Sequence, residues 1–324
     1  MKIYRNIEDF IPLDNAVVTI GTFDGVHIGH QKIISNLKEY AQKIGGQTVL
    51  LTFFPHPRMI LHPDDDSLKL INTIEEKAER LADSGIDHLI ITPFTRDFSN
   101  QSAEEYIREI LVSKIGTKRI VIGYDHHFGK DRKGSLVDLL KYTEMYHYTV
   151  QEIPEQDIND VAVSSTKIRE ALIIGEIATA NDYLGYPFMI TGKVVKGQQL
   201  GRTIGYPTAN IDVAESYKLI PAYGIYAVEA TIIEHAAMTT GEYAPAKKGP
   251  VLKGMGYIGT RPTVKGLNRS IEINFFDLHE DLYGKTVQIQ FLHFVRHDHK
   301  FDSVEALTSQ LAADEKQIRV LLGV

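Results

Sequence analysis

The chain has 324 residues, of which 43% are hydrophobic and 24% are charged, and its formal net charge is -7. This length suggests two domains, and the composition is that of a globular protein that can bury a sizeable core. The negative charge argues against a protein that coats nucleic acid or an anionic membrane, because either partner would require a basic surface. The absence of cysteine excludes disulfides, thiolate metal sites and cysteine nucleophiles.

The first residues lack the apolar core of a signal peptide, and no apolar run approaches the ~20 residues of a membrane helix. We therefore expect a cytoplasmic protein.

The first half of the chain alternates between strand-like and helix-like segments. Nearly continuous apolar runs, typical of strands covered on both faces, span 16–20, 48–54, 88–93, 118–123 and 148–153. Helical segments are predicted over 31–44, 74–84, 103–115 and 136–145. Ser102 and Glu105 have the spacing of a capping box at the start of the third of these helices. This alternation predicts a doubly wound α/β domain with a parallel sheet.

The unusual polar residues of this half follow the predicted strands. Ligands of doubly wound sheets bind beyond the carboxyl ends of the strands, so we expect these residues to share one rim. The segments concerned are 21–31, 55–58, 94–97, 123–134 and 164–169. Each piece also has a simpler interpretation: His56 between prolines could shape a turn, and His126 and His127 could lie in a solvated loop.

The segment 20–34, which reads IGTFDGVHIGHQKII, joins the first predicted strand to the first predicted helix. Gly21 and Gly25 permit a tight turn, and the first amides of a helix beginning near Gly29 form a phosphate-binding position. His27 and His30 are three residues apart, so they would project to one side and reach the same anion. A single histidine at this place would more simply be a surface or capping residue.

A second candidate phosphate-binding segment follows the last predicted strand of this half. Ser164, Ser165 and Thr166 supply hydroxyls at a predicted helix start, and Arg169 lies on the first turn. This combination suits the outer phosphates of a nucleotide. The alternative is that the hydroxyls are only helix caps.

The pattern changes after the helical stretch 167–184, where Gly185-Tyr186-Pro187 interrupts it. Alternating segments typical of antiparallel strands span 188–195, 223–233, 251–258, 270–276 and 285–295, and a final helix is expected within 301–322. We predict a small antiparallel barrel with one packed helix. The predicted domains are therefore 1–184 and 185–324.

Three strings in the second half have simpler structural interpretations. The glycines of 254–259 fit a dinucleotide fingerprint, but Thr-Arg-Pro-Thr follows instead of a helix. The string 284–286 resembles the end of a P-loop but lacks the upstream glycine, so we expect a turn. His293, His297 and His299 could be metal ligands, but an exposed strand end is the preferred interpretation.

The string 201–210, which reads GRTIGYPTAN, contains a candidate metal site. The Thr208 hydroxyl and the Asn210 amide carbonyl would lie on one face of an extended segment, and both are hard oxygen ligands suited to Mg²⁺. A proline-marked edge strand with outward polar residues is the alternative. Glu272 stands in an otherwise apolar strand, where a carboxylate needs a partner or a task unless it faces solvent.

The string GTFDGVHIGHQ at 21–31 resembles the FAD synthetase branch of the nucleotidyltransferase superfamily, whose HxGH signature binds ATP. The resemblance implies that an FMN phosphate attacks the α-phosphorus of ATP and pyrophosphate leaves. His27 and His30 would stabilise the α-phosphate region, and Arg169 with the neighbouring hydroxyls would hold the pyrophosphate. The residues implied in nucleotide binding are Gly21, Thr22, Phe23, Asp24, Gly25, Asp125, Ser164, Ser165 and Thr166. This chain has His126 where an aromatic residue is usual, and Phe54 where an acidic residue is common.

The motif GYPTAN at 205–210 resembles riboflavin kinases, in which it binds Mg²⁺ and ATP phosphates. Further segments similar to that family follow in the expected order at 223–228, 259–263, 271–277 and 294–303. The resemblance implies ATP or metal contacts for Gly201, Arg202, Gly205, Pro207, Thr208 and Asn210. It also implies that Glu272 is the general base that takes the proton of the ribityl hydroxyl during attack on the γ-phosphate.

Together these resemblances imply a bifunctional enzyme that converts riboflavin and ATP to FMN, and then FMN and a second ATP to FAD. The implied partners are small molecules and Mg²⁺, with no nucleic acid or membrane, and the implied assembly is a monomer or a weak homo-oligomer. Two alternatives remain: an adenylyltransferase for another phosphate acceptor with a degenerate second domain, and a flavin-binding regulator without turnover.

Overall fold

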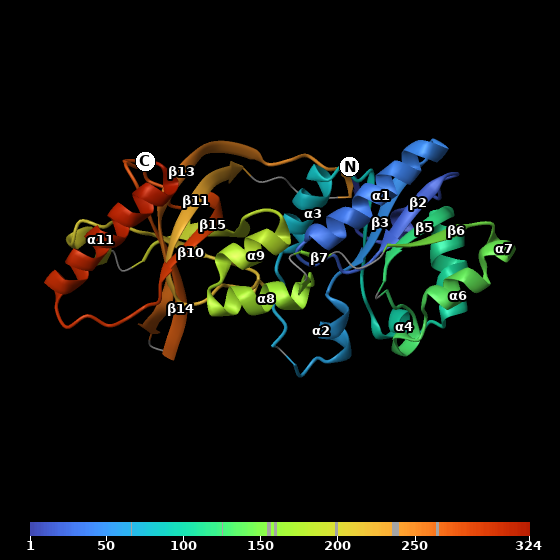
Figure 1. The fold of residues 1–324 in the computed structure, drawn as a ribbon, viewed down its shortest axis with the longest axis horizontal. Helices are drawn as coiled ribbons and strands as arrows, with labels where there is room; N and C mark the ends of the chain where they lie inside the picture. The colour runs from blue at the N-terminus through green and yellow to red at the C-terminus, as the bar shows by residue number, and fades with distance from the viewer. Residues whose placement is uncertain are drawn as a thin grey trace. The chain divides into compact units, whose positions relative to one another are not determined.

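The computed structural model describes residues 1–65, 67–124, 126–153, 157–158, 161–197, 200–234, 240–263 and 266–324 (Figure 1). The chain forms two compact units. The first contains Met1–Ser164 and Ala237–Pro245, and the second contains Ser165–Ala236 and Ala246–Val324.

The first unit is built on a seven-stranded sheet with the strand order β12-β1-β4-β3-β2-β5-β6. All neighbours pair in parallel except β12, which is antiparallel to β1. The strands are β1 (Lys2–Tyr4), β2 (Ala16–Ile20), β3 (Gln47–Phe53), β4 (His88–Thr92), β5 (Thr117–Gly123), β6 (Thr149–Ile153) and β12 (Gly241–Glu242). Every residue of β2 and β4 is buried, as their continuous apolar runs predicted.

Helices cover both faces of this sheet, which confirms the predicted doubly wound fold. On one face, α1 (Ile28–Ile44) and α3 (Ile74–Asp83) bury apolar stripes that include Leu37 and Leu81. On the other face, the helix Tyr106–Ile115 (η2) and α6 (Leu136–Lys141) bury Leu111 and Leu139. The remaining elements are η1 (Ile7–Asp9), α2 (Pro57–Leu61), α4 (Arg96–Ser99), α5 (Ala103–Glu105), η3 (Lys130–Arg132), α7 (Thr143–Tyr146) and the strand pair β7 (Asp157–Ile158) and β8 (Val161–Ala162).

The capping box predicted at Ser102 and Glu105 is confirmed. The Glu105 amide donates to the Ser102 hydroxyl at 3.2 Å, and the Ser102 amide donates to the Glu105 carboxylate at 2.8 Å. The helix that they start continues past α5 with π-helical geometry in η2. The sequence pattern therefore located this helix but not its winding.

Two neighbouring strands at one side of the sheet, the interior strand β1 and the edge strand β12, were not predicted. Strand β1 has three residues and β12 has two, which is too short for a side-chain period to be recognised. Strand β12 comes from the polar connection around 234–249, and it pairs Glu242 with Lys2. A segment from late in the sequence thus completes the edge of the first sheet.

The second unit is a closed antiparallel barrel with the strand order β10-β14-β13-β11-β15-β9, which confirms the predicted architecture. Its strands are β9 (Phe188–Val195), β10 (Ala209–Asp212), β11 (Gly224–Glu234), β13 (Lys247–Thr263), β14 (Gly266–Phe275) and β15 (Thr286–Arg296). Its helices are α8 (Ser165–Ile174), α9 (Ile177–Leu184), α10 (Leu200–Thr203) and α11 (Val304–Leu322). Helix α11 packs Ile318 and Leu322 against Ile225 and Met255 of the barrel, so it is the predicted packed helix.

None of the helices in the described ranges combines the length and apolar character that crossing a membrane requires.

A buried ion pair joins the last barrel strand to α11. The Arg296 guanidinium donates to both carboxylate oxygens of Asp314, with distances of 2.7 to 3.0 Å, and Asp314 is 1% exposed. The Gln310 amide also donates to Asp314 at 2.8 Å. The carboxylate is therefore fully engaged inside the protein.

Replacing Arg296 with methionine should destabilise the second unit by about 3 kcal/mol, because it leaves the Asp314 carboxylate buried without its cation. Scanning calorimetry should show a lower transition temperature for this unit. The double variant Arg296→Met/Asp314→Leu should recover most of the loss, since it removes both charges. A single variant as stable as the wild type would show that the pair contributes no net stability.

Candidate active sites

The first candidate site lies where β2 ends and α1 begins. His27 is the N-cap residue of α1, and His30 lies in its first turn. Their imidazole rings stack with centroids 3.7 Å apart and planes 24° apart, and the His30 ring also packs against Phe23 at 4.7 Å. The two histidines therefore lie together at a helix N-terminus, where backbone amides favour an anion.

The turn before α1 has an unusual backbone. Gly25 has a φ of 87°, and Phe23 and Val26 have φ values of 46° and 37°. Positive φ is rare for residues other than glycine and rarest for β-branched residues such as valine. The turn therefore needs external contacts to hold its shape.

Buried polar contacts supply that support. Asp24 is 1% exposed, and its carboxylate accepts hydrogen bonds from the backbone amides of Ile71 at 3.0 Å and Asn72 at 3.3 Å. The Thr22 carbonyl accepts hydrogen bonds from the Thr52 hydroxyl at 3.2 Å and from the Lys77 ammonium at 2.7 Å. The segment 71–77 thus stabilises the turn through hydrogen bonds to Thr22 and Asp24.

The electrostatics of the site favour a neutral His30. Burial, then the neighbouring His27 and then the positive charge of Lys77 together hold the pKa of His30 well below its usual range. The buried Nδ1 atom of His30 makes no hydrogen bond within the described residues. A neutral imidazole at this place can still donate one N–H to a phosphate oxygen.

The topological switch point of the sheet lies at this same edge. Strand β2 has β3 on one side and β5 on the other, so the crevice for ligands is expected beyond the ends of β2 and β5. After β5, the His126 ring lies 5.8 Å from Phe128 in a stacked arrangement, and burial lowers the pKa of His126 to about 4. Asp125 lies outside the described residues.

Of the other residues predicted to lie on the rim, one caps a helix, and others belong to the second unit. The His56 ring accepts a hydrogen bond from the Arg58 amide at 3.2 Å as the N-cap of α2, which is the predicted turn-shaping role. Ser164 is the last residue of the first unit before the chain enters the second unit at Ser165. The residues Ser165, Thr166 and Arg169 belong to α8 in the second unit.

The second candidate site lies on the barrel. The Thr208 hydroxyl donates to the Glu272 carboxylate at 3.0 Å, and β10 pairs with β14 so that Asn210 is opposite Glu272. A hydroxyl and an amide from one segment therefore lie close to a carboxylate on the neighbouring strand. Strand β10 was predicted only as an extended segment, but it closes the barrel and creates this juxtaposition.

The segment before β10 is a compact turn. The Tyr206 amide donates to the Gly201 carbonyl at 2.8 Å, and a Cβ atom on Gly201 would lie 2.2 Å from the Tyr206 carbonyl oxygen. Gly205 has a φ of 87°. These two glycines are therefore required by the turn that leads to Thr208.

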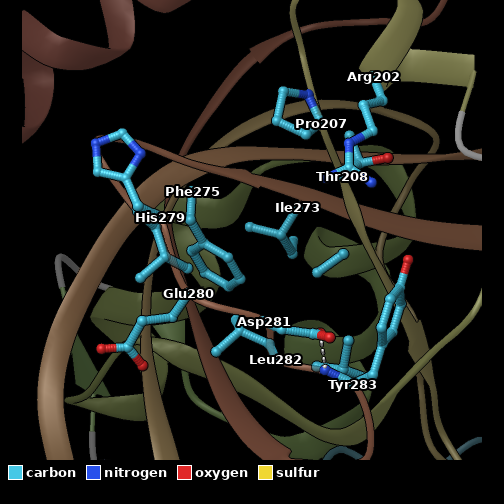
Figure 2. Close-up of a pocket in the computed structure, with 13 residues that line it drawn as sticks. Arg202, Pro207, Thr208, Ile273, Phe275, His279, Glu280, Asp281, Leu282 and Tyr283 are labelled. Carbon is cyan, nitrogen blue, oxygen red and sulfur yellow. Dashed lines mark hydrogen bonds between the residues drawn. The ribbon is translucent and has the colours of Figure 1, made fainter.

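A cavity of about 480 Å³ adjoins Thr208 (Figure 2). Arg202, Pro207 and Thr208 line one part, the loop from Leu278 to Tyr283 lines another, and Ile273 and Phe275 contribute apolar side chains. Its volume and mixed lining are typical of a small-molecule site. The 278–283 loop was not predicted from the sequence, where its one signal was the expected turn at 284–286.

Thr208 lies between this cavity and Glu272. Ile273 and Phe275 line the cavity, whereas Glu272 alternates with them along β14 and points to the opposite side of the strand. The Thr208 side chain both lines the cavity and contacts Glu272. A molecule in the cavity and a second molecule at Glu272 could therefore meet at Thr208.

The structure supports the simpler interpretations of the other motifs. Residues 254–259 lie within the long strand β13, and Gly284 forms a turn with a φ of 79°. His293, His297 and His299 are exposed. Within the described ranges, no three histidine, cysteine, aspartate or glutamate side chains are grouped as metal ligands.

Comparison with known proteins matches the two halves of the chain to two family models. Residues 11–167 match the family model for FAD synthetase, and residues 184–322 match that for riboflavin kinase. A bifunctional riboflavin kinase/FMN adenylyltransferase from Listeria monocytogenes is 38% identical over 310 residues, covering 95% of this chain and 93% of the relative. The protein of the same name from Escherichia coli K12 is 34% identical, covering 100% of this chain and 99% of the relative.

A solved structure has the same fold over nearly the whole chain. It is described as a macrolide-efflux protein from Streptococcus pneumoniae, and it superimposes with a TM-score of 0.85 at 32% identity, covering 98% of each chain. That description concerns the streptococcal protein alone. On the full-length similarity to the curated relatives, the chain belongs to the family of bifunctional riboflavin kinase/FMN adenylyltransferases.

Proposed function

We propose that residues 1–184 carry the FMN adenylyltransferase activity and residues 185–324 carry the riboflavin kinase activity. The chain is a bifunctional enzyme that phosphorylates riboflavin to FMN and adenylylates FMN to FAD. The stacked histidines beyond β2 lie in the first unit and the Thr208–Glu272 contact lies on the barrel of the second, which supports assigning one reaction to each.

In the adenylyltransferase reaction, a phosphate oxygen of FMN attacks the α-phosphorus of ATP, and the bond to pyrophosphate breaks. Negative charge then increases on the α-phosphate oxygens and on the leaving group. His27 and His30 donate hydrogen bonds to the α-phosphate, and the backbone from Gly21 to Gly25 lies against the nucleotide. Preorganised donors of this kind lower the barrier without a covalent intermediate.

The hydroxyls at the start of α8 and the arginine at position 169 of that helix are assigned to the leaving group. Ser164, Ser165 and Thr166 donate hydrogen bonds to pyrophosphate oxygens, and the Arg169 guanidinium compensates their charge. Asp125 is assigned to the adenosine or a metal contact. Both assignments follow from the position of these residues in the FAD synthetase motif pattern.

In the kinase reaction, the terminal ribityl hydroxyl of riboflavin attacks the γ-phosphorus of ATP, and ADP leaves. Glu272 accepts the proton of that hydroxyl. The cavity beside Thr208 holds ATP, so that its phosphates point toward Thr208 and Glu272, with Gly201, Arg202, Gly205 and Pro207 in the turn around them. This arrangement is supported by the position of Thr208 between the cavity and Glu272.

The donor set at this point fits Mg²⁺. Thr208 and Asn210 contribute a hydroxyl and an amide carbonyl, which are hard oxygen donors, and Asn210 faces Glu272 across the strand pair. Mg²⁺ usually takes few protein ligands and completes its shell with water and phosphate oxygens. Bound here, the ion would neutralise charge on the ATP phosphates.

Replacing Asn210 with alanine tests this assignment. The variant should need a higher Mg²⁺ concentration for half-maximal riboflavin phosphorylation and lose about tenfold in rate at limiting Mg²⁺. Conversion of added FMN to FAD by the same preparation serves as the control and should keep its wild-type rate. A kinase rate with an unchanged Mg²⁺ dependence would remove Asn210 from the metal site.

We also propose the substrates, the location and the oligomeric state of the enzyme. Its substrates and products are small molecules, namely riboflavin, FMN, FAD and ATP, and it acts without nucleic acid or membrane. The net charge of -7 and the lack of cysteine support a cytoplasmic protein, which we assign as a monomer or a weak homo-oligomer.

A further inference from the structure

A buried lysine lies beneath the turn that carries the two histidines. Lys77 is in the first half of α3, and it is 3% exposed. Its ammonium donates to the Thr22 carbonyl at 2.7 Å. None of the residues assigned above to adenylyl transfer is a lysine.

The turn that Lys77 contacts is conformationally strained. Phe23 and Val26 both have positive φ values, on either side of the buried Asp24. Such conformations persist only when surrounding contacts fix them, and they occur preferentially at functional sites. Lys77 and the amides that bind Asp24 all come from 71–77, so this segment contributes several of the contacts that fix the turn.

The hydrogen bond to the Thr22 carbonyl does not by itself require a charged donor. The Thr52 hydroxyl already donates to the same Thr22 carbonyl at 3.2 Å, and Thr52 is fully buried. Burying an ammonium costs free energy, which a neutral donor or an apolar side chain would avoid. The presence of a charged residue here therefore calls for a role beyond satisfying one carbonyl.

The electrostatic surroundings suggest what that role is. Burial lowers the pKa of Lys77 to about 8, and the negative charge of Asp24 opposes this effect. Lys77 in turn lowers the pKa of His30, in addition to burial and His27. The groups that face each other are thus Asp24 on the turn, His27 and His30 at the start of α1, and Lys77 on α3.

We propose that Lys77 is a positioning residue for adenylyl transfer, whose ammonium holds the strained turn so that His27 and His30 are presented to the phosphates of ATP. This inference rests on the proposed assignment of the two histidines to the adenylyltransferase site. Lys77 acts through the Thr22 carbonyl from beneath the turn. Its charge also adds to burial and to His27 in favouring the neutral form of His30.

The pH dependence of the native enzyme gives the first test. Lys77 is charged below a pH of about 8 and loses its proton as the pH rises through that value. FAD formation from added FMN should therefore decline above that pH in the wild type. The variant Lys77→Arg keeps the charge, because arginine stays protonated, and it should lose this alkaline decline. Riboflavin phosphorylation, measured in both proteins, controls for effects on substrates.

A second test separates the charge from the hydrogen bond. Lys77→Met should lower the turnover number of FAD formation by roughly tenfold or more, with a smaller change in KM for FMN. It should also raise the pKa of His30, measured by NMR titration of the imidazole, because a neighbouring positive charge is lost. Thr52→Val is the matched control: it removes the other hydrogen bond to Thr22 and should leave the pKa of His30 unchanged.

The outcomes distinguish this inference from the site assignment. An alkaline decline that is the same in the wild type and in Lys77→Arg would overturn the role of Lys77, and so would a folded Lys77→Met variant with the wild-type turnover number. If His30→Ala also retains FAD formation, the histidine assignment itself is wrong. If His30→Ala loses it while both Lys77 variants match the wild type, only the role of Lys77 is refuted.

Discussion

Replacing His30 with alanine should reduce FAD formation from FMN by about 100- to 1,000-fold, the range observed when a single transition-state hydrogen-bond donor is removed. The expected loss follows from the place of His30 at the N-terminus of α1, stacked on His27 at 3.7 Å. The variant should still phosphorylate riboflavin at the wild-type rate. Separate assays with riboflavin or FMN as the starting flavin, resolved by chromatography, measure the two reactions.

The matched control is His62→Ala, which removes an exposed histidine at the end of α2 in the same unit. It should affect neither reaction. Unchanged FAD formation in His30→Ala would contradict the assignment of the histidine pair. Loss of both reactions would instead indicate a folding defect or coupled sites, which a thermal unfolding scan of the variant would separate.

Replacing Glu272 with glutamine should lower the rate of riboflavin phosphorylation by about 100- to 10,000-fold, the usual contribution of a general base. An amide has nearly the same shape and can still accept a hydrogen bond from Thr208, but it cannot take a proton from the ribityl hydroxyl. Added FMN should be converted to FAD as in the wild type. The initial rate of FMN appearance from riboflavin is the quantity to measure.

Glu234→Gln is the control for this variant, because Glu234 is an exposed glutamate at the end of a barrel strand. It should keep both activities. A Glu272→Gln enzyme with an undiminished kinase rate would refute Glu272 as the base. The contact with Thr208 would then be a structural hydrogen bond between β14 and the segment before β10.

The sequence predicted the features that depend on local patterns. Strand β2 spans the predicted 16–20 and α1 ends at the predicted Ile44, because long apolar runs and helical spacing specify such elements strongly. The histidine pair was predicted from a spacing of three residues at a strand-to-helix turn. The stacked rings confirm that the two side chains lie on one side of the helix.

The features that were missed depend on contacts between distant segments. Strand β12 becomes a strand only by pairing with β1, and two residues carry no pattern that could predict it. The pairing of Asn210 with Glu272 required the closure of the barrel through β10. Neither follows from a local period, since both depend on the tertiary fold.

Lys77 is different, because a signal for its burial was present in the sequence. Ile74, Ala78 and Leu81 have the spacing of one helix face and are buried, and Lys77 falls on that same face. A lysine at a core position of an amphipathic helix indicates a buried charge that needs a partner. What the sequence could not provide is the identity of that partner, the Thr22 carbonyl.

The two alternative functions receive no support from the comparisons. A degenerate second domain is disfavoured because residues 184–322 match the riboflavin kinase model. A regulator that keeps the sites without turnover receives no support either, because both family models describe enzymes.

The measurement that tests bifunctionality most directly is the incubation of the purified protein with riboflavin, ATP and Mg²⁺, with the flavins resolved by chromatography over time. We predict that riboflavin is consumed, that FMN appears first, and that FAD follows together with pyrophosphate. Unchanged riboflavin, or FMN that is never converted to FAD in the presence of excess ATP, would contradict the account.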